Sequence, residues 1–434
     1  MAGRLEIVKM WTPEVEAKLD ESLSLMMKKN LEISKKFDHY ITEEKIDRIC
    51  TSKEDKEVAE KVEHKFNWLD PKTVLERFPL LLTNYERQEI LTFSKIYYIG
   101  SSKMSYRKIS GDPLCNFGYD DREDYYISLP HDHINYRYEI LTVLGKGSYG
   151  EVLKVFDHKT GQFAAMKIIR NDKRFLHQSK REVKILQHLL REDQSNTANV
   201  IHIENNFIFR RHMCIVFELL SLNLYELVKK NNFRGLKLSV VKRFAHSVAV
   251  GLSLVHRKQI IHGDLKPENV LLQQYGRTGV KIIDFGSSVY TDGKLMAYAQ
   301  SRFYRAPEVI LGCHYDTAVD MWSFGCLLAE LVLGQPLLPG HDEEDQLALI
   351  VELLGRPPAS LLARARNRGQ TTAQPRPMTR GPPGSRSLQL LLSPYVRQKE
   401  ERLMIDLVRR CLDWQPRDRL TAVQALTHPW LASL

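Results

Sequence analysis

The sequence lacks the features that would place the protein in a membrane or outside the cell. It contains no run of about twenty apolar residues, the length that a membrane-spanning helix needs. The first residues carry an acid early and no long apolar segment, so we expect no secretory signal. Ala2 stands where myristoylation requires glycine. We therefore expect no membrane partner.

Cysteine is also scarce. The six cysteines lie scattered over 434 residues without C-x-x-C spacing, which indicates reduced thiols in an intracellular protein and argues against a zinc site. The net charge of +10 raises the question of nucleic acid, but the basic residues are dispersed and no aromatic-interleaved patch accompanies them. We expect no nucleic-acid partner. We expect the cytoplasm as the compartment, with the nucleus second, because we find no convincing nuclear localisation cluster.

The N-terminal part divides into two regions of different character. Residues 1–75 are charged and helical in pattern, with Thr12 as a helix cap and Pro13 in the first turn. This pattern predicts a surface helix that packs by one face; the alternative is that residues 1–70 dock an unknown partner. Residues 76–137 contain short, aromatic-rich pieces suited to lying along the surface of another domain.

A short polar loop at 261–270 lies between apolar segments. Asp264 is followed two residues later by Lys266 and five residues later by Asn269. Phosphoryl transfer needs this set, because it uses an acceptor for the attacking hydroxyl, a cation for the moving charge and an oxygen ligand for magnesium. The motif is short enough to arise by chance, so its interpretation depends on partners elsewhere in the chain.

A glycine-rich segment follows the strand predicted at 138–144. Dinucleotide-binding folds and kinases share the pattern G-x-G-x-x-G, but a valine and a second strand after it favour the kinase hairpin. Glycines let the backbone approach the phosphates of ATP. The ATP-binding residues expected here are Leu144, Gly145, Lys146, Gly147, Ser148, Tyr149, Gly150, Glu151 and Val152.

Further residues supply the partners that the polar loop requires. Lys167, on a predicted strand, would hold the α- and β-phosphates and pair with Glu182 on a predicted helix. We expect Lys167→Met to abolish turnover and leave the fold nearly intact, because the site faces solvent. Asp284, which opens the sequence Asp-Phe-Gly, would bind Mg²⁺ together with Asn269.

The adenine contacts are expected from the strand that carries Ala165 and from a second apolar strand. Phe217 is interpreted as the gatekeeper, and Glu218, Leu219 and Leu220 as the hinge. Phe217 as an ordinary core residue is equally compatible with the pattern.

Three residues are expected to be structural. A buried Glu308 needs a cationic partner, for which Arg419 is the candidate, and Asp320 could hydrogen-bond the backbone of the 261–270 loop. Residues 356–398 contain eight arginines and no acid, which predicts a mobile loop; an acidic partner is the alternative.

Residues 138–430 resemble a eukaryotic protein kinase of the group that contains the cyclin-dependent and MAP kinases, because all these motifs occur in one order at kinase-like separations. Within that group the match to the dual-specificity tyrosine-phosphorylation-regulated kinase (DYRK) family is close. The segments that carry it are 217–227, 284–288, 300–305, the acidic box 119–125, which resembles the family's DH box, and 82–100, which is similar to the accessory segment of its class II branch.

The resemblance implies an α+β bilobal fold, with a β-rich N-lobe at 138–220, a helical C-lobe at 221–430 and an N-terminal accessory region. It implies a dual-specificity kinase that uses ATP and Mg²⁺ to phosphorylate serine or threonine of protein substrates, with proline following and arginine upstream. Asp264 would take the proton of the substrate hydroxyl, and Lys266 would steady the γ-phosphate.

The resemblance also implies roles for the segment after Asp-Phe-Gly. Tyr298 matches a tyrosine that the nascent kinase phosphorylates on itself, and Arg302 and Arg305 are near enough in sequence to receive its phosphate. Arg305 would also shape the proline site. Glu268 and Tyr304 would contact the arginine of the substrate.

The chain departs from the family pattern at a few positions. Gly263 and Val289 replace two cysteines, Met296 replaces the first tyrosine of the activation motif, and Ala299 replaces a bulkier aliphatic residue. No catalytic group is lost. The alternative reading is a catalytically weak pseudokinase or scaffold that binds partners through the N-terminal helix and the Arg-rich loop, but pseudokinases commonly lose the strand lysine, the loop aspartate or the DFG aspartate, and all three are present.

Overall fold

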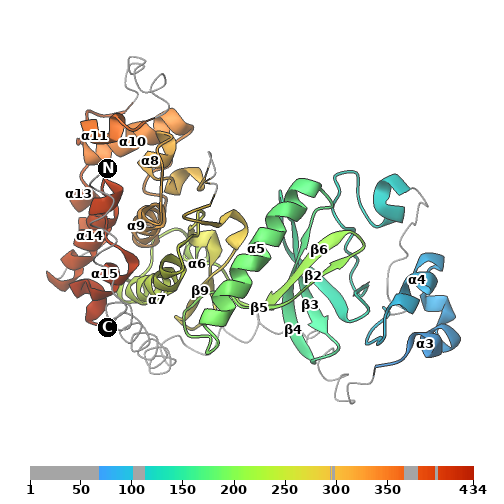
Figure 1. The fold of residues 1–434 in the computed structure, drawn as a ribbon. Coiled ribbons are helices and arrows are strands. Elements are labelled where there is room, and N and C mark those ends of the chain that lie inside the picture. The colour runs from blue at the N-terminus through green and yellow to red at the C-terminus, as the bar shows by residue number, and fades with distance from the viewer. Residues whose placement is uncertain (1–67, 101–112, 294, 296–298, 366–379, 396–398) are drawn as a thin grey trace, which may run out of the picture. The chain divides into compact units, whose positions relative to one another are not determined.

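The computed structural model describes residues 68–100, 113–293, 295, 299–365, 380–395 and 399–434. These residues form two compact units, one with residues up to 190 and 201–220 and the other with 191–200 and 221–434 (Figure 1). We call them the N-lobe and the C-lobe. They differ from the predicted division in that residues 191–200 group with the C-lobe. The helix predicted at the N-terminus lies outside the described residues.

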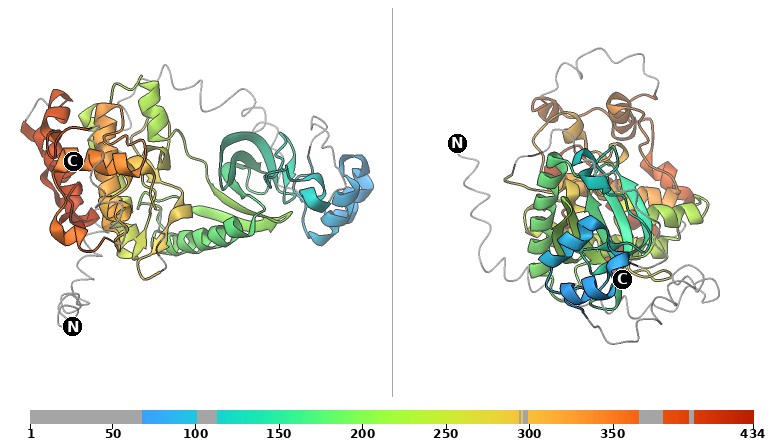
Figure 2. Two further views of the ribbon diagram at one scale, coloured as in Figure 1. Left: turned by 90° about the horizontal axis from the view of Figure 1, so that it is seen from above. Right: turned by 90° about the vertical axis from the view of Figure 1, so that its right-hand side faces the viewer.

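The N-lobe contains a six-stranded antiparallel sheet with the order β1-β2-β3-β4-β6-β5, which curls strongly (Figure 2). Its strands are β1 (His133–Ile134), β2 (Tyr138–Gly147), β3 (Gly150–Asp157), β4 (Gln162–Ile169), β5 (Ile203–Phe209) and β6 (His212–Glu218). Side chains alternate between the two faces of a strand, so Ala164, Met166 and Ile168 are buried on one face. Ala165 and Lys167 therefore lie on the other face.

The described residues before the sheet, 68–100 and 113–118, are part of the N-lobe core, and we call them the accessory segment. It folds into α3 (Pro71–Arg77), η3 (Pro79–Leu81), α4 (Asn84–Glu89), η4 (Ile90–Thr92) and η5 (Pro113–Gly118). Thr83 and Glu86 form a capping box that starts α4, with each side chain bonded to the backbone N–H of the other residue. Val74, Leu82 and Ile90 are fully buried in one cluster with the inner face of the sheet. The segment thus does more than lie along the surface of another domain, as the sequence had suggested.

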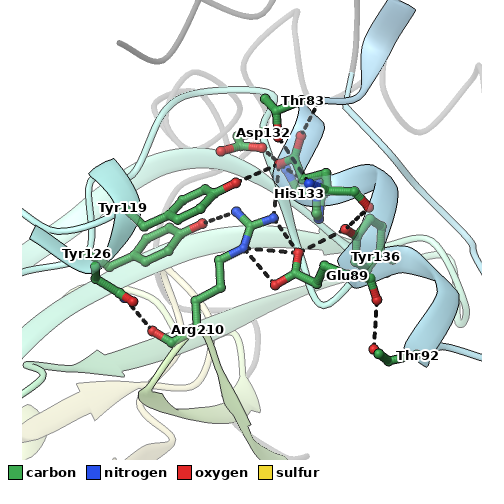
Figure 3. A network of polar contacts seen from close by, with 11 residues as sticks. Thr83, Glu89, Thr92, Tyr119, Tyr126, Asp132, His133, Tyr136 and Arg210 are labelled. Carbon is green, nitrogen blue, oxygen red and sulfur yellow. Dashed lines mark hydrogen bonds and ion pairs between the residues drawn. The ribbon is translucent and has the colours of Figure 1, made fainter. Parts of the chain in front are cut away.

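A buried arginine connects the accessory segment to the sheet. Arg210 lies in the turn between β5 and β6, and its side chain has no exposed surface. Its Nη2 lies 2.9 Å from Glu86 and 2.7 Å from Glu89, and its Nη1 donates to the Tyr126 hydroxyl at 3.2 Å (Figure 3). The guanidinium also stacks 3.8 Å from the Tyr119 ring centroid. We call this set the Arg210 node.

The helix that carries Glu182 is α5 (Lys173–Glu192). Its buried face includes Glu182, Val183 and Leu186. The helix therefore presents one carboxylate on an otherwise apolar stripe, which is where a cationic partner is needed.

The C-lobe is mostly helical. Its helices are α6 (Leu224–Lys230), α7 (Leu238–Arg257), α8 (Pro307–Ile310), α9 (Ala318–Leu333), α10 (Glu343–Leu354), α11 (Ala359–Leu362), α13 (Leu388–Leu392), α14 (Lys399–Cys411), α15 (Ala422–Thr427) and α16 (Pro429–Ala432). Helices α7 and α9 pack against each other, with α15 against α7 and α14 against α9 (Figure 1). Helix α7 is long and apolar enough to cross a membrane, but most of it is buried inside the C-lobe, as in the core helix of a globular domain.

Short elements connect these helices. They are the strand pairs β7 (Ile260–Ile261) with β10 (Val289–Tyr290) and β8 (Val270–Leu272) with β9 (Val280–Ile282), and the single turns η6 (Pro267–Asn269), η7 (Phe285–Ser287), η8 (Arg302–Tyr304), η9 (Ser393–Tyr395) and η10 (Pro416–Asp418). The two strand pairs hold the polar loop of residues 262–269 between β7 and β8.

The prediction of a single loop at 356–398 is wrong for the parts that the structure describes. These parts contain α11, α13 and η9. Helix α13 is stabilised by Ser387, which caps its N-terminus, and by the burial of Leu392. Arg380 forms two hydrogen bonds of 2.8 Å with Asp345, and this pairing lowers the pKa of Asp345 to about 2. Arg380 is thus paired with an acid of the C-lobe itself.

Candidate functional site

The glycine-rich hairpin connects β2 and β3 and pairs Gly147 with Gly150 across a turn. Gly150 has φ +150°, and a Cβ there would collide with the Ile168 carbonyl. A Cβ at Gly145 or Gly147 would meet nothing within 4 Å. Packing thus requires glycine at the third position only, and the first two are available for the close approach of a ligand.

The face of the sheet that carries Lys167 is only partly covered within the N-lobe. The strand register places Val152 opposite Lys167, and Phe217 opposite Ala165, so these four side chains share one face. Val152, Ala165 and Phe217 are all partly exposed, and Leu144 is 51% exposed. The predicted adenine contacts are thus brought together, and Phe217 is not a fully buried core residue.

Two predicted nucleotide contacts are engaged with the protein. Glu151 is buried, accepts a hydrogen bond from the Ser128 hydroxyl, and has a pKa raised by its burial. Its side chain is therefore engaged within the protein, and a contact of its main chain with ATP stays a prediction. Glu218 accepts from the His202 backbone N–H at 3.0 Å, so only its main chain fits the hinge role; Leu219 and Leu220 follow β6 and are partly exposed.

The predicted ion pair between Lys167 and Glu182 is confirmed. Lys167 Nζ lies 2.8 Å and 3.1 Å from the two carboxylate oxygens of Glu182. The side chains are 14% and 3% exposed, so the expectation that this site faces solvent is wrong. The Lys167 side chain extends from β4 to α5, where its charge neutralises that of the buried Glu182 carboxylate.

In the C-lobe the polar loop converges on the Asp264 carboxylate. Its Oδ2 accepts hydrogen bonds from Lys266 Nζ at 2.8 Å and from Asn269 Nδ2 at 3.2 Å. Its Oδ1 accepts from the backbone N–H and the hydroxyl of Ser301, at 3.1 and 2.7 Å. The aspartate, lysine and asparagine predicted from the sequence therefore form one cluster, and Ser301 completes it.

Asp320 holds this loop from beneath, as predicted. It is fully buried in α9 and accepts from the backbone N–H groups of His262 at 2.8 Å and Gly263 at 2.9 Å. Burial alone would raise the pKa of Asp320, but the hydrogen bonds from His256 and the loop backbone hold it below its ordinary value. Gly263 has φ +77°, and a Cβ there would lie 3.1 Å from the Ser287 carbonyl oxygen. Glycine is therefore the least strained residue at this position.

Asp284 follows β9, which pairs with β8 directly after the 262–269 loop. It adopts a left-handed backbone conformation, and the backbone N–H of the preceding Ile283 donates to the Asn269 carbonyl at 2.9 Å. Phe285 is buried and packs edge-on to the His262 ring, with centroids 5.0 Å apart. The two predicted magnesium ligands, Asn269 and Asp284, are thus tied to neighbouring backbone.

The arginines after Asp-Phe-Gly already bind carbonyl oxygens. Arg305 is buried and donates to the carbonyls of Ala299 at 2.9 Å and Gln300 at 2.7 Å, and to Glu343 at 2.7 Å. Arg302 donates to the His341 carbonyl at 2.5 Å. We expected both arginines to receive a phosphate on Tyr298, but in this conformation their guanidinium groups are bonded to protein oxygens. Tyr298 itself lies outside the described residues.

A cluster of acids lies beside Tyr304. The Tyr304 hydroxyl donates to Glu330 of α9 at 2.6 Å, and both residues are buried. The pKa of Glu330 is raised to about 7 by its burial and by the nearby charge of Glu268. Within the described residues, one carboxylate oxygen of Glu268 is buried without a hydrogen-bond partner. These two carboxylates could accept hydrogen bonds from a cationic group.

The predicted pair of Glu308 and Arg419 is confirmed. The guanidinium donates to the two carboxylate oxygens at 2.6 and 2.7 Å, and both side chains are buried. This two-bonded geometry connects α8 to the chain after η10 and is structural.

Sequence reasoning missed Ser301 and Glu330. Ser301 is 37 residues from Asp264, and no spacing rule connects the two. Glu330 lies in α9, which is largely apolar, and an acid among apolar residues is the one signal that the sequence offers; it does not say what the acid binds.

Comparisons with known proteins agree with this geometry. Residues 138–431 match the family model described as the protein kinase domain. The chain is 46% identical over 388 residues to dual specificity tyrosine-phosphorylation-regulated kinase 3 of Rattus norvegicus, covering 84% of this chain and 65% of the relative. The corresponding kinase 3 of Macaca fascicularis is 46% identical, with 84% and 67% covered. The kinase mbk-2 of Caenorhabditis elegans is 47% identical, with 83% and 46% covered.

The chain spans about two thirds of the length of these mammalian relatives and about half of the nematode relative. The matches include the accessory segment as well as the two lobes, because they extend well beyond the residues of the kinase domain model. The chain therefore contains a protein kinase domain and belongs to the family of dual specificity tyrosine-phosphorylation-regulated kinases.

Proposed function

We propose that the chain is an active protein kinase that transfers the γ-phosphate of ATP to serine or threonine of protein substrates. The observation that carries this proposal is the convergence of Lys266, Asn269 and Ser301 on the Asp264 carboxylate. The Lys167–Glu182 pair of the N-lobe supports it. The family membership agrees with it.

Asp264 is proposed to orient the substrate hydroxyl and to take its proton. Its carboxylate is fixed by hydrogen bonds on both oxygens, and a hydroxyl of the substrate would replace that of Ser301, which already donates to Oδ1 at 2.7 Å. Lys266, 2.8 Å from the other oxygen, would balance the negative charge of the transferred phosphoryl group. Lys167 would hold the α- and β-phosphates.

Magnesium is proposed as the metal, with Asn269 and Asp284 as its ligands. The Asn269 amide nitrogen donates to the Asp264 carbonyl at 2.8 Å, which leaves its carboxamide oxygen as the ligand atom. A carboxylate and a carboxamide oxygen are the hard donors that Mg²⁺ prefers. The ion would neutralise the phosphate charge when bound.

The acids beside Tyr304 favour substrates with an arginine upstream of the acceptor. Glu268 and Glu330 place two carboxylates near each other in a largely buried position, and a guanidinium would satisfy both. A peptide of the type R-x-x-S-P would therefore be preferred to one with alanine in place of the arginine. The preference for proline after the acceptor, with Arg305 shaping the proline site, rests on the family resemblance.

Autophosphorylation on Tyr298 is proposed as the activating step. Protein made in bacteria should carry phosphotyrosine at this position, and peptide mapping by mass spectrometry tests it. Arg302 and Arg305 would have to release their carbonyl partners in order to bind the phosphate. An unmodified Tyr298 in a fully active enzyme would refute the step.

The transfer itself is tested with labelled ATP and an R-x-x-S-P peptide. Wild type should transfer phosphate, and Asp264→Asn should not, since an amide cannot accept the proton. Equal signals from the two proteins would favour the scaffold reading. Cytoplasmic localisation, with the nucleus second, also stays a proposal, which imaging of the tagged full chain tests.

A further inference from the structure

The acidic box of residues 119–125 folds into a compact turn that is anchored in the N-lobe. The Asp121 carboxylate accepts from the backbone N–H groups of Glu123 and Tyr125, each at 2.9 Å. Asp120 is buried and bonded to His212 of β6 at 2.8 Å and to Asn171 at 2.9 Å. The box is therefore held in place by the sheet.

The box contacts the tip of the glycine-rich hairpin. The Tyr125 hydroxyl donates to the Gly147 carbonyl at 2.8 Å. Lys146 of the hairpin lies 3.8 Å from the Tyr125 ring centroid and 3.6 Å from the Asp121 carboxylate. A cation over a tyrosine ring is attracted to the ring. The Lys146 ammonium group is therefore attracted both to the Tyr125 ring and to the Asp121 carboxylate.

Arg170, just after β4, holds the next two carbonyls of the tip. Its side chain donates to the Ser148 carbonyl at 3.2 Å and its backbone N–H to the Tyr149 carbonyl at 3.0 Å. The same side chain donates to the Glu123 backbone carbonyl of the box at 2.9 Å and lies 4.7 Å from the Tyr125 ring centroid. Three successive carbonyls of the hairpin, from residues 147 to 149, are thus bonded to one frame made of the box and Arg170.

Holding these carbonyls also fixes the amides of the hairpin. A peptide unit is planar and trans, so its C=O and the N–H of the next residue point in opposite directions. The carbonyls of residues 147, 148 and 149 therefore set the directions of the N–H groups of Ser148, Tyr149 and Gly150. Those N–H groups are the donors that a glycine-rich loop offers to phosphate.

We propose that Tyr125 and Arg170 are positioning residues that orient the glycine-rich hairpin for the phosphates of ATP. The proposal rests on the proposed kinase function. It assigns the acidic box a role in nucleotide affinity, through the backbone of the hairpin and without contact to the nucleotide.

The test is Tyr125→Phe in the full chain, which removes one hydroxyl and keeps the ring. The matched control is Tyr98→Phe, whose hydroxyl donates to the His131 carbonyl at 2.9 Å in the same lobe and which lies outside the hairpin. Loss of one such hydrogen bond should raise the KM for ATP about fivefold in Tyr125→Phe, with a smaller change in kcat. The control should keep the wild-type KM. Arg170→Met should reproduce the effect of Tyr125→Phe.

Measurements of nucleotide binding distinguish a specific effect on the orientation of the hairpin from a general destabilisation of the N-lobe. Titration of the proteins with Mg·ATP and with adenosine should show weaker ATP binding in Tyr125→Phe and Arg170→Met and unchanged adenosine binding, because adenosine has no phosphate. Equal losses for both ligands, or a KM no different from that of Tyr98→Phe, would overturn the proposal. Absence of phosphate transfer by the wild type would instead refute the proposed function, and the two failures are thereby distinct.

Discussion

Replacement of Arg210 by methionine should destabilise the N-lobe strongly. The change leaves Glu86 and Glu89, which now lie 2.9 and 2.7 Å from the guanidinium, as buried or nearly buried carboxylates without their cation. Removing one partner of a buried ion pair costs about 3–5 kcal/mol, which corresponds to a fall in Tm of roughly 6–20 °C for a unit of this size. Methionine keeps most of the apolar volume, so the lost charge is the main perturbation.

Arg211→Met is the control, because Arg211 is the next residue of the same turn and is exposed. Its guanidinium lies 5.9 Å from the Phe117 ring centroid, an exposed contact worth about 0.5–1 kcal/mol. Calorimetry and denaturant titration of the two variants measure the difference, and hydrogen exchange of β5 and β6 assigns it to the N-lobe. A loss below about 1 kcal/mol for Arg210→Met, equal to that of the control, would refute the reasoning.

The pH dependence provides a second check on the same variant. Burial opposes ionisation of Glu86, but His133 and Arg210 hold its pKa below the ordinary value. In the wild type this contribution to stability is present above the pKa of the unfolded carboxyl, about 4.3, and is lost as the pH falls through the lower native pKa. Without Arg210 one of the groups that lower the pKa of Glu86 is gone, so this pKa rises and protonation of the carboxylate costs less free energy. The stability difference should therefore be largest near pH 8 and should shrink toward pH 5.

Three further changes have definite expected outcomes. Lys167→Met should abolish phosphate transfer and also lower the Tm by several degrees, because Glu182 is 3% exposed and loses its cation; an unchanged Tm would contradict the burial. Gly263→Ala should cost about 1–3 kcal/mol in unfolding free energy, because φ is +77° and the new Cβ lies 3.1 Å from a carbonyl oxygen; a neutral effect in denaturant titration would contradict the strain. The KM for an arginine-containing peptide should rise as the pH falls from 8 to 6, because the pKa of Glu330 is raised to about 7 and protonation removes its charge. Glu330→Gln should abolish that dependence. A variant whose KM changes with pH as that of the wild type does would exclude Glu330 as a contact of the peptide arginine.

The sequence was informative where a function imposes fixed spacing. The kinase motifs predicted the bilobal fold, the Lys167–Glu182 pair and the cluster of Asp264, Lys266 and Asn269, because each residue type is needed at a set place along the chain. It could not supply contacts between remote segments. Arg210 follows a strand in a turn, where an exposed arginine is the ordinary expectation, and only the folded accessory segment brings Glu86 to it from 124 residues away.

Local pattern also misjudged exposure. Glu151 is expected from the sequence to contact the nucleotide, yet its side chain is buried and accepts a hydrogen bond from the Ser128 hydroxyl. The arginine content of 356–398 predicted a loop, whereas part of this stretch forms α13, whose Leu392 is buried in the C-lobe. In both cases packing partners from elsewhere in the chain outweighed the local composition.

The hydrophobic core that the accessory segment shares with the sheet determines how far the protein can be truncated from its N-terminus. The kinase domain model begins at Tyr138, but the inner face of the sheet is covered by residues as early as Val74. A fragment that started at 138 would expose the apolar side chains of β2, β3 and β4 that Leu82, Ile90 and Ile96 now cover, and would tend to aggregate. The smallest autonomously folding piece is therefore expected to begin where the hydrophobic interior closes, about 64 residues before the match to the kinase domain begins.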